Sequence, residues 1–177
     1  MAAPLRVGLL STANINRLLL GGARAAEGVE VVAVASRDGA RAEAFATEHG
    51  IGRAHGSYDA LLGDADVDAV YVPLPNSLHV EWSIRALEAG KHVLCEKPLT
   101  RHPDQAEAAF DAAEHAGRVL AEAFMWRHHP QARRVRELAG DGAMAACGWC
   151  ARRSRSTSSA WTAPTTCGCR RASTAAG

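Results

Sequence analysis

The chain has 177 residues, enough for one domain and part of a second. Hydrophobic residues make up 47% of it, charged residues 22%, and the formal net charge is +1, so composition indicates a globular protein and gives no reason to expect a nucleic-acid or membrane partner. No apolar run is long enough to span a bilayer. The start runs directly into a strand without a signal-peptide layout, and the cysteine count of five is odd. We therefore expect a cytoplasmic protein without a disulfide framework.

The first predicted unit is a strand over 5–10, a turn of small residues and a helix to about residue 27, with Leu18 and Leu19 expected on its buried side. Strand, turn and helix in this order are typical of a dinucleotide-binding unit. Ser11, Ala13 and Asn16 stand where the G-x-G-x-x-G pattern has its glycines. Ser and Ala still allow close backbone approach, and a helix N-terminus favours phosphate. The alternative is an ordinary strand-to-helix turn.

A second apolar strand, over 30–35, ends in Ser36 and Arg37. In an NAD site an acidic residue near this point binds the ribose 2′-hydroxyl, whereas in an NADP site an arginine and a hydroxyl donor bind the 2′-phosphate. The pair therefore favours NADP over NAD. The alternative is a solvated loop arginine.

Helices and strands continue to alternate along the chain to about residue 139. We expect Gly50 to end the helix before it, Asn76 or Ser77 to cap the helix over 78–89, and Val80, Ile84 and Leu87 to form the apolar stripe of that helix. The expected strands lie at 53–55, 68–72, 91–95 and 118–124, and the expected helices at 39–49, 57–62, 78–89, 102–117 and 131–139. Six strands alternating with helices predict an α/β fold, a Rossmann-type doubly wound parallel sheet.

The segment Glu96-Lys97-Pro98 follows the apolar strand over 91–95, and lysine occurs otherwise only at Lys91. Ionised groups resist burial, and the carboxyl edge of a parallel sheet is where such folds place their chemistry. We expect Lys97 to meet a substrate there; the alternative is a surface lysine. His79, in the first turn of its helix, is expected on position alone to be partly exposed. The adjacent pair at 128–129 points apart on extended backbone, and no metal site is expected there.

Five segments together resemble the Gfo/Idh/MocA family of NAD(P)-dependent oxidoreductases, and within it the NADP-dependent aldose and trans-dihydrodiol dehydrogenases. The resemblance covers about residues 5–144, and its Glu-Lys-Pro and Phe-Met-Trp-Arg segments are the specific ones. The segments are 10–15, 36–37, 71–82, 89–99 and 121–130.

The resemblance implies roles for residues at the sheet edge. Lys97 would bind substrate and assist the reacting hydroxyl, and the Lys97–Pro98 bond would be cis. The resemblance further implies that the diphosphate is held by Ser11, Thr12, Ala13, Asn14 and Ile15, and that the 2′-phosphate is held by Ser36 and Arg37. It implies that the nicotinamide side is lined by Leu74, Asn76, His79 and Glu96. It also implies that Trp126 and Arg127 close over the cofactor.

The chain changes character after Met144. Through Asp141 it has 15 Lys and Arg against 19 Asp and Glu, whereas the rest has five Arg and no acid. A zinc site on the Cys pairs 147/150 and 167/169, a disordered basic tail and a frameshift are the three explanations. Restoring one G after the Met144 codon, with GC-rich codons, yields a strand-like string similar to the family's next strand, so a frameshift is the preferred hypothesis.

The expected domains are a dinucleotide-binding domain at 1–124, a linker loop and helix at 125–144, and a non-native or disordered basic tail at 145–177. The family's second α+β domain, with its oligomer contacts and the other half of the active site, would be missing. The predicted function is NADP-dependent hydride transfer (NAD possible) between nicotinamide and a sugar or diol hydroxyl or carbonyl, in a homo-oligomeric parent, with this chain an inactive fragment. The alternative is a non-catalytic NADP-binding module or sensor.

Overall fold

The computed structural model describes residues 3–140, which divide into a first unit ending at Met125 and a second beginning at Trp126. The first unit is built on a sheet whose strand pairs are all parallel and whose order is β3-β2-β1-β4-β5-β6. The strands are β1 Leu5–Leu9, β2 Val29–Ala35, β3 Arg53–His55, β4 Ala69–Val72, β5 His92–Cys95 and β6 Leu120–Glu122. This order reverses between β1 and β4, which is the Rossmann arrangement, so the predicted fold class is confirmed.

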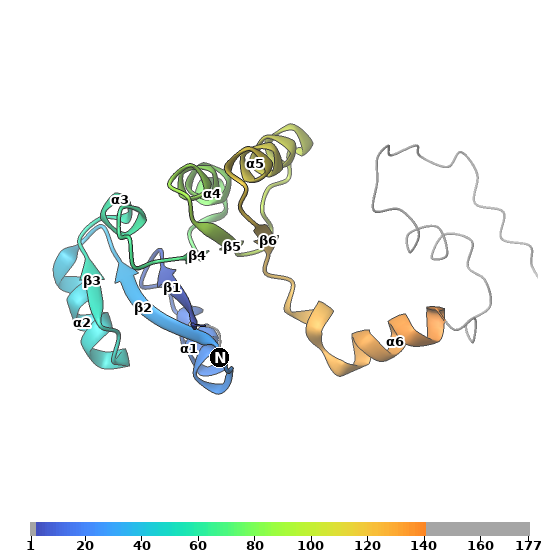
Figure 1. Cartoon of the computed structure of the whole chain (residues 1–177), viewed down its shortest axis with the longest axis horizontal. Coiled ribbons are helices and arrows are strands. Elements are labelled where there is room, and N and C mark those ends of the chain that lie inside the picture. Colours follow the sequence, from blue (N-terminus) through green and yellow to red (C-terminus); the bar gives the residue numbers. More distant parts are fainter. Residues whose placement is uncertain (1–2, 141–177) are drawn as a thin grey trace, which may run out of the picture. The chain divides into compact units, whose positions relative to one another are not determined.

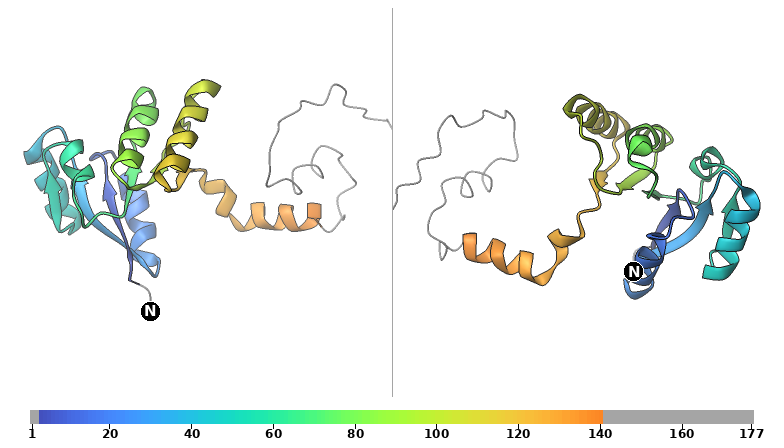
Figure 2. Two further views of the ribbon diagram at one scale, coloured as in Figure 1. Left: turned by 45° about the horizontal axis from the view of Figure 1, so that its top comes forward. Right: turned by 180° about the vertical axis from the view of Figure 1, so that it is seen from behind.

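Helices cover both faces of the sheet (Figure 1). Two of them, α1 and α2, pack on one face, and α3, α4 and α5 pack on the other, with α4 and α5 side by side (Figure 2). The helices are α1 Asn16–Ala25, α2 Gly39–His49, α3 Tyr58–Leu62, α4 His79–Glu88 and α5 Pro103–Ala116, with a 3-10 turn, Asn76–Leu78, before α4.

Alternation along the central strands builds two apolar cores. In β4, Tyr71 points into the core beneath α1 and α2, whereas Val70 and Val72 point into the core beneath α3, α4 and α5. At the end of β1, Leu9 likewise points into the core beneath α1 and α2, whereas Leu10 points into the core beneath α3, α4 and α5. Both faces of these strands are buried, and this explains why the sequence reads as continuous apolar runs rather than alternating ones.

Local signals fix most helix ends. The side chains of Asp38 and Ser57 accept backbone N–H groups at the starts of α2 and α3. Gly50 ends α2 in the left-handed conformation at φ 65°, as expected. The expected cap of α4 is wrong, because neither Asn76 nor Ser77 makes a side-chain cap; both precede α4 as part of the 3-10 turn.

Two expected helix faces are observed only in part, because Leu19 of α1 and Val80 and Ile84 of α4 pack partly buried against the core while other residues take the fully buried positions. Leu18 is 67% exposed, and the buried line of α1 runs through Asn16 and Leu20, one turn apart. In α4 the buried residues are His79, Ser83, Ala86 and Leu87, so of the expected stripe only Leu87 is fully buried. In both helices a small or polar residue takes a core position that an apolar pattern alone does not indicate.

The second unit contains α6, Pro130–Gly140, preceded by a 3-10 turn, Met125–His128, that begins at the unit boundary. No helix among residues 3–140 is long and apolar enough to cross a bilayer. In the same residues no three His, Cys, Asp or Glu side chains gather as metal ligands would. The expected tail at 145–177, its cysteine pairs and the proposed frameshift lie outside the described residues, and the expected domain boundaries stay predictions.

Candidate active site

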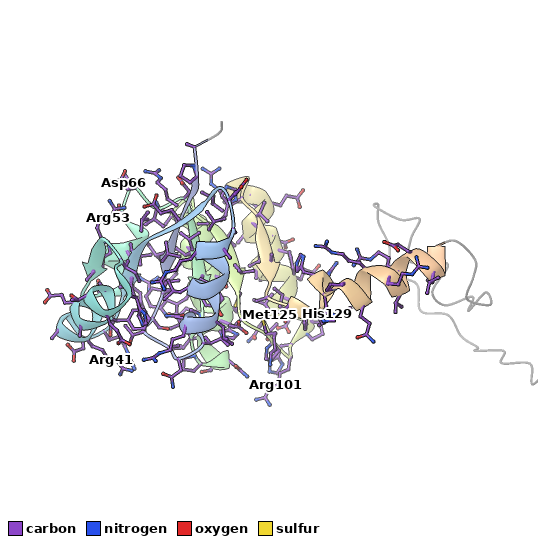
Figure 3. The ribbon with its side chains drawn as sticks, turned by 90° about the horizontal axis from the view of Figure 1, so that it is seen from below. Arg41, Arg53, Asp66, Arg101, Met125 and His129 are labelled. Carbon is purple, nitrogen blue, oxygen red and sulfur yellow. The ribbon has the colours of Figure 1, made fainter. Side chains whose placement is uncertain are left out.

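Parallel strands bring their carboxyl ends to one edge of the sheet, and the candidate residues of the first unit follow those ends. Ser11 follows β1, Ser36 follows β2, and Glu96 follows β5. Figure 3 shows Arg53 and Asp66, which form an ion pair at 2.9 Å, at the edge opposite Arg41 and Arg101. Charges thus lie at both edges, but the loops that follow strands converge at only one.

Side-chain hydrogen bonds shape the turn between β1 and α1. Ser11 Oγ accepts the Ala13 N–H at 3.2 Å, and Asn16 Nδ2 donates to the Ser11 carbonyl at 2.6 Å. Asn16 is fully buried beneath the turn. The backbone N–H groups of Thr12, Asn14 and Ile15 donate to no group in the described residues. Free N–H groups before a helix N-terminus are what a phosphate needs.

Ser36 and Arg37 lie at the end of β2 in contrasting environments. Ser36 is 8% exposed and its Oγ accepts the Asp38 N–H at 3.2 Å. Arg37 is exposed and has no ion pair or hydrogen bond within residues 3–140. The neighbouring acid, Asp38, caps α2 by accepting the Arg41 N–H at 3.3 Å. An unpaired arginine here can meet an anion without first breaking a contact.

The loop after β4 carries Leu74, Asn76 and His79. Leu74 is 7% exposed, whereas Asn76 is exposed. His79 is 1% exposed, so the expectation that it is partly exposed is wrong. Its Nε2 lies 2.7 Å from the Leu74 carbonyl oxygen and its Nδ1 lies 2.8 Å from that of Pro98. The protein itself therefore occupies both ring nitrogens.

The Glu96-Lys97-Pro98 segment is held from several directions. Tyr71 Oη donates to Glu96 Oε1 at 2.5 Å, and the Lys97 N–H donates to Glu96 Oε2 at 3.2 Å. The expected cis bond between Lys97 and Pro98 is confirmed. Beyond the proline, the Leu99 N–H donates to Glu122 Oε1 at 2.8 Å. These contacts fix the backbone on both sides of Lys97.

The side chains here differ in their readiness to react. Lys97 is exposed, and its ammonium makes no hydrogen bond or ion pair within the described chain. Burial, followed by the hydrogen bond to Glu96, raises the pKa of Tyr71, so this phenol stays protonated and donates. Burial also raises the pKa of the Cys95 thiol to about 11, which makes it a poor nucleophile. Lys97 is thus the accessible candidate on this segment.

Trp126 and Arg127 belong to the second unit, where both are exposed. Their expected closure over a cofactor stays a prediction.

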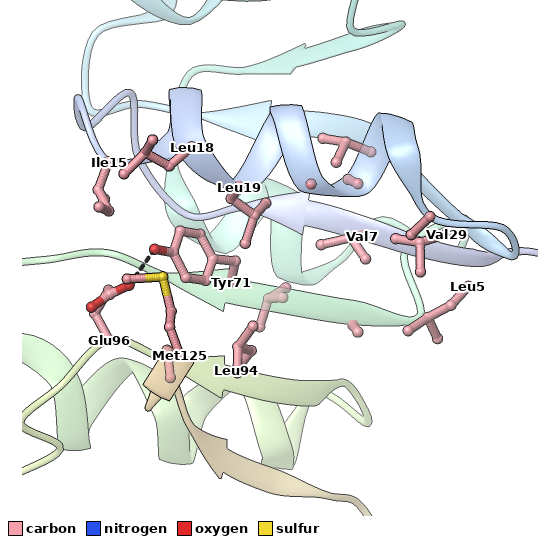
Figure 4. Close-up of a pocket in the computed structure, with 17 residues that line it drawn as sticks. Leu5, Val7, Ile15, Leu18, Leu19, Val29, Tyr71, Leu94, Glu96 and Met125 are labelled. Atoms are coloured by element: carbon pink, nitrogen blue, oxygen red, sulfur yellow. Dashed lines mark hydrogen bonds between the residues drawn. The ribbon is translucent and has the colours of Figure 1, made fainter. Parts of the chain in front are cut away.

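An apolar groove of about 470 Å³ runs along the sheet face beside α1 (Figure 4). Leu5 and Val29 lie at one end of it, and Tyr71 and Glu96 at the other. Only the latter end reaches the carboxyl edge, and the apolar lining offers few groups for a charged ligand. We therefore place the candidate site at the edge rather than in the groove.

The sequence pattern assigned no hydrogen-bonding role to Tyr71, Glu122 or Asn16, although the first two lie within the segments that carried the family resemblance and Asn16 stands at the third glycine position of the phosphate-turn pattern. A signal was present for two of them. Tyr71 is a hydroxyl-bearing residue in the apolar run of β4, and Glu122 is an acid at the last residue of β6. Their partners, Glu96 and Leu99, are more than 20 residues away in the chain, so the contacts themselves could not be read from local pattern.

Comparison with known proteins agrees with this geometry. A family model described as an oxidoreductase family with an NAD-binding Rossmann fold matches residues 5–124. The chain belongs to the Gfo/Idh/MocA family.

Among Gfo/Idh/MocA relatives, D-xylose 1-dehydrogenase (NADP(+)) 2 of Haloferax volcanii is 53% identical over 131 residues, which is 74% of this chain and 40% of that protein. A dTDP-3,4-didehydro-2,6-dideoxy-alpha-D-glucose 3-reductase of Actinomadura kijaniata is 49% identical over 142 residues, 80% of this chain and 42% of that protein. The crystal structure of KijD10, a 3-ketoreductase from the same organism, in complex with NADP superposes with a TM-score of 0.72 at 48% identity, covering 80% of this chain and 45% of that one. The chain thus spans between 40% and 45% of the length of these Gfo/Idh/MocA relatives.

Proposed function

We propose that the chain is the NADP-binding part of an oxidoreductase that transfers a hydride between nicotinamide and a sugar or diol hydroxyl or carbonyl group. The relatives' names support the substrate class, because one acts on D-xylose and another on a dideoxyglucose nucleotide. The homo-oligomeric state expected of a longer protein belongs to the same proposal.

The residues present fit a dinucleotide. The turn over 11–15, with its free N–H groups, suits the diphosphate. Ser36 and the unpaired Arg37 suit a 2′-phosphate, because a guanidinium binds phosphate with paired N–H donors. Arg41, in the first turn of α2, adds a second exposed guanidinium four residues later.

NADP would supply the hydride, and the chain's own residues would supply placement and a proton path. Leu74, Asn76 and Glu96 would line the nicotinamide side, with His79 behind Leu74. Lys97, exposed on a fixed backbone, would bind the substrate hydroxyl and exchange its proton. Trp126 and Arg127 would act from the second unit.

The single observation that carries the proposal is Arg37, an exposed guanidinium without a partner in the described residues at the end of β2. Titration of the purified 177-residue chain with NADPH and NADH, followed by nicotinamide fluorescence, tests it. We expect saturable binding with NADPH preferred by about tenfold or more, the discrimination that one charge-assisted contact gives. Equal affinity for the two, or no binding of either, would contradict the proposal.

A further inference from the structure

His79 is the first residue of α4, yet its ring is enclosed rather than facing the sheet edge. It stands between two loops that are separate in sequence, the one after β4 and the one after β5. Leu74, on the first loop, lies five residues before it, and Pro98, on the second, lies 19 residues after it. One ring therefore spans the two loops that carry the candidate nicotinamide and substrate groups.

The two contacts make a specific chemical demand. A backbone carbonyl oxygen can only accept a hydrogen bond, and a neutral imidazole has a single N–H. The distances of 2.7 Å to Leu74 and 2.8 Å to Pro98 are both those of made hydrogen bonds. Both can exist together only when each ring nitrogen carries a proton.

We propose that His79 is a positioning residue whose ring, with a proton on each nitrogen, joins the Leu74 and Pro98 carbonyl groups and so sets Lys97 against the nicotinamide end of the cofactor site. The inference rests on the NADP-binding function proposed above. It assigns His79 an effect through the backbone of the two loops and not through contact with the cofactor.

The two hydrogen bonds of His79, to the Leu74 and Pro98 carbonyl groups, form a clamp between the loops. The neighbouring contacts show why this clamp matters for Lys97. Glu96 is fixed by Tyr71, and the Leu99 N–H is fixed by Glu122. The Pro98 carbonyl between them is fixed by His79. Loss of the ring leaves the carbonyl of Pro98, the residue that directly follows Lys97, without its partner and frees the Leu74 carbonyl at the same time.

The effect should be confined to one end of the site. The phosphate turn over 11–15 is shaped by Ser11 and Asn16, and Ser36 and Arg37 follow β2. None of these residues hydrogen-bonds His79 in the described chain. The affinity for a ligand that carries the 2′-phosphate but lacks nicotinamide should therefore not depend on the His79 ring.

The protonation of His79 can be read directly by NMR of the full chain labelled with ¹⁵N-histidine. We expect two exchange-protected ring N–H signals that both vanish in His79→Asn. Two protected protons at this residue would be specific evidence for the double contact, because a neutral ring carries only one. A single ring proton on His79 would overturn the two-sided clamp. The measurement is made on the wild-type chain, and His79→Asn serves only to assign the signals.

The second test compares binding of NADPH with binding of adenosine 2′,5′-bisphosphate, which has the 2′-phosphate and no nicotinamide. His79→Asn, which keeps one donor, should raise the Kd for NADPH by about fivefold. His79→Leu, which keeps no donor, should raise this Kd further. The Kd for the bisphosphate should stay unchanged. His115→Asn, on the last turn of α5 and exposed, is the matched control and should change neither.

The outcomes separate the two proposals. If the wild-type chain binds neither ligand, the proposed NADP function fails. If it binds both and the His79 variants weaken both equally, His79 is a structural residue and the positioning role is wrong. Variants that bind both ligands as the wild type does would also refute it.

Discussion

Tyr71 Oη donates a 2.5 Å hydrogen bond to Glu96 Oε1, and this contact joins the ends of two neighbouring strands, β4 and β5. The phenol lies in the core beneath α1 and α2, whereas the carboxylate leads directly into Lys97. The glutamate of the Glu-Lys-Pro segment is thus oriented from inside the sheet.

Tyr71→Phe should lower the free energy of unfolding by about 1.5–3 kcal/mol, because a partly buried hydrogen bond to a carboxylate is lost while the aromatic ring keeps its shape. Urea denaturation measures it. Tyr58→Phe is the matched control, since the Tyr58 ring packs against Trp82 and its hydroxyl makes no hydrogen bond in the described residues. Equal losses for the two variants would show that the Glu96 contact contributes nothing.

Arg37→Ala should raise the Kd for NADPH about tenfold and leave the Kd for NADH nearly unchanged, because only the former has a 2′-phosphate for the guanidinium to bind. Fluorescence titration of both cofactors gives the ratio. Arg24→Ala, in the last turn of α1, removes the same charge at the opposite edge of the sheet and should leave the ratio as it is. A parallel loss of NADPH and NADH binding would place Arg37 outside the 2′-phosphate site.

The 177-residue chain should bind NADPH without steady turnover of sugars or diols. It spans about 40% of the length of relatives that carry out such reactions, and Lys97 is the one candidate reacting group identified at its described sheet edge. The check is the nicotinamide absorbance of the purified chain with NADP and a panel of aldoses and vicinal diols at ordinary enzyme concentration. Sustained reduction that depends on the added substrate would contradict the expectation.

Asp68 should make the fold sensitive to acid. Its hydrogen bond with Arg6 lowers the pKa of this carboxyl from 3.8 to about 2. The folded state therefore binds the proton less readily than the unfolded state, so this contribution to stability is complete above about pH 4 and is lost as the pH falls to about 2. Because the side chains are about a third exposed, we expect it to be about 1 kcal/mol.

Asp68→Asn should flatten the decline in unfolding free energy between pH 4 and pH 2, measured by denaturation at a series of pH values. Asp111→Asn, on the exposed side of α5 and without an ion pair in the described chain, should leave the decline as in the wild type. An unchanged profile for Asp68→Asn would mean that the Arg6 contact does not influence folding.

The elements could be predicted because their signals are local. Apolar runs marked the strands, and Gly50 marked the end of α2. The exact helix faces could not, because Asn16 and His79 occupy core positions through hydrogen bonds to loops, which an apolar period does not register. Propensity and pattern describe each helix alone, whereas its buried side is decided by the groups that it meets.

The candidate site divides in the same way. Arg37 and Lys97 could be named from their positions after strands, because an exposed charge needs no partner to be recognised. The residues that hold the site could not: Tyr71 reaches Glu96 across 25 residues, and Glu122 reaches Leu99 across 23. The pairing register of the strands creates these contacts, and the sequence pattern leaves that register open.

The turn between β1 and α1 has a thermodynamic consequence. Turns rich in glycine are adaptable, and ordering them on a ligand loses conformational entropy. Here Ser11 and Asn16 already tie the turn together with their own side chains. The loop that would receive a diphosphate is therefore rigid beforehand, so its association with a nucleotide should carry a smaller entropic penalty than the same step on a glycine loop.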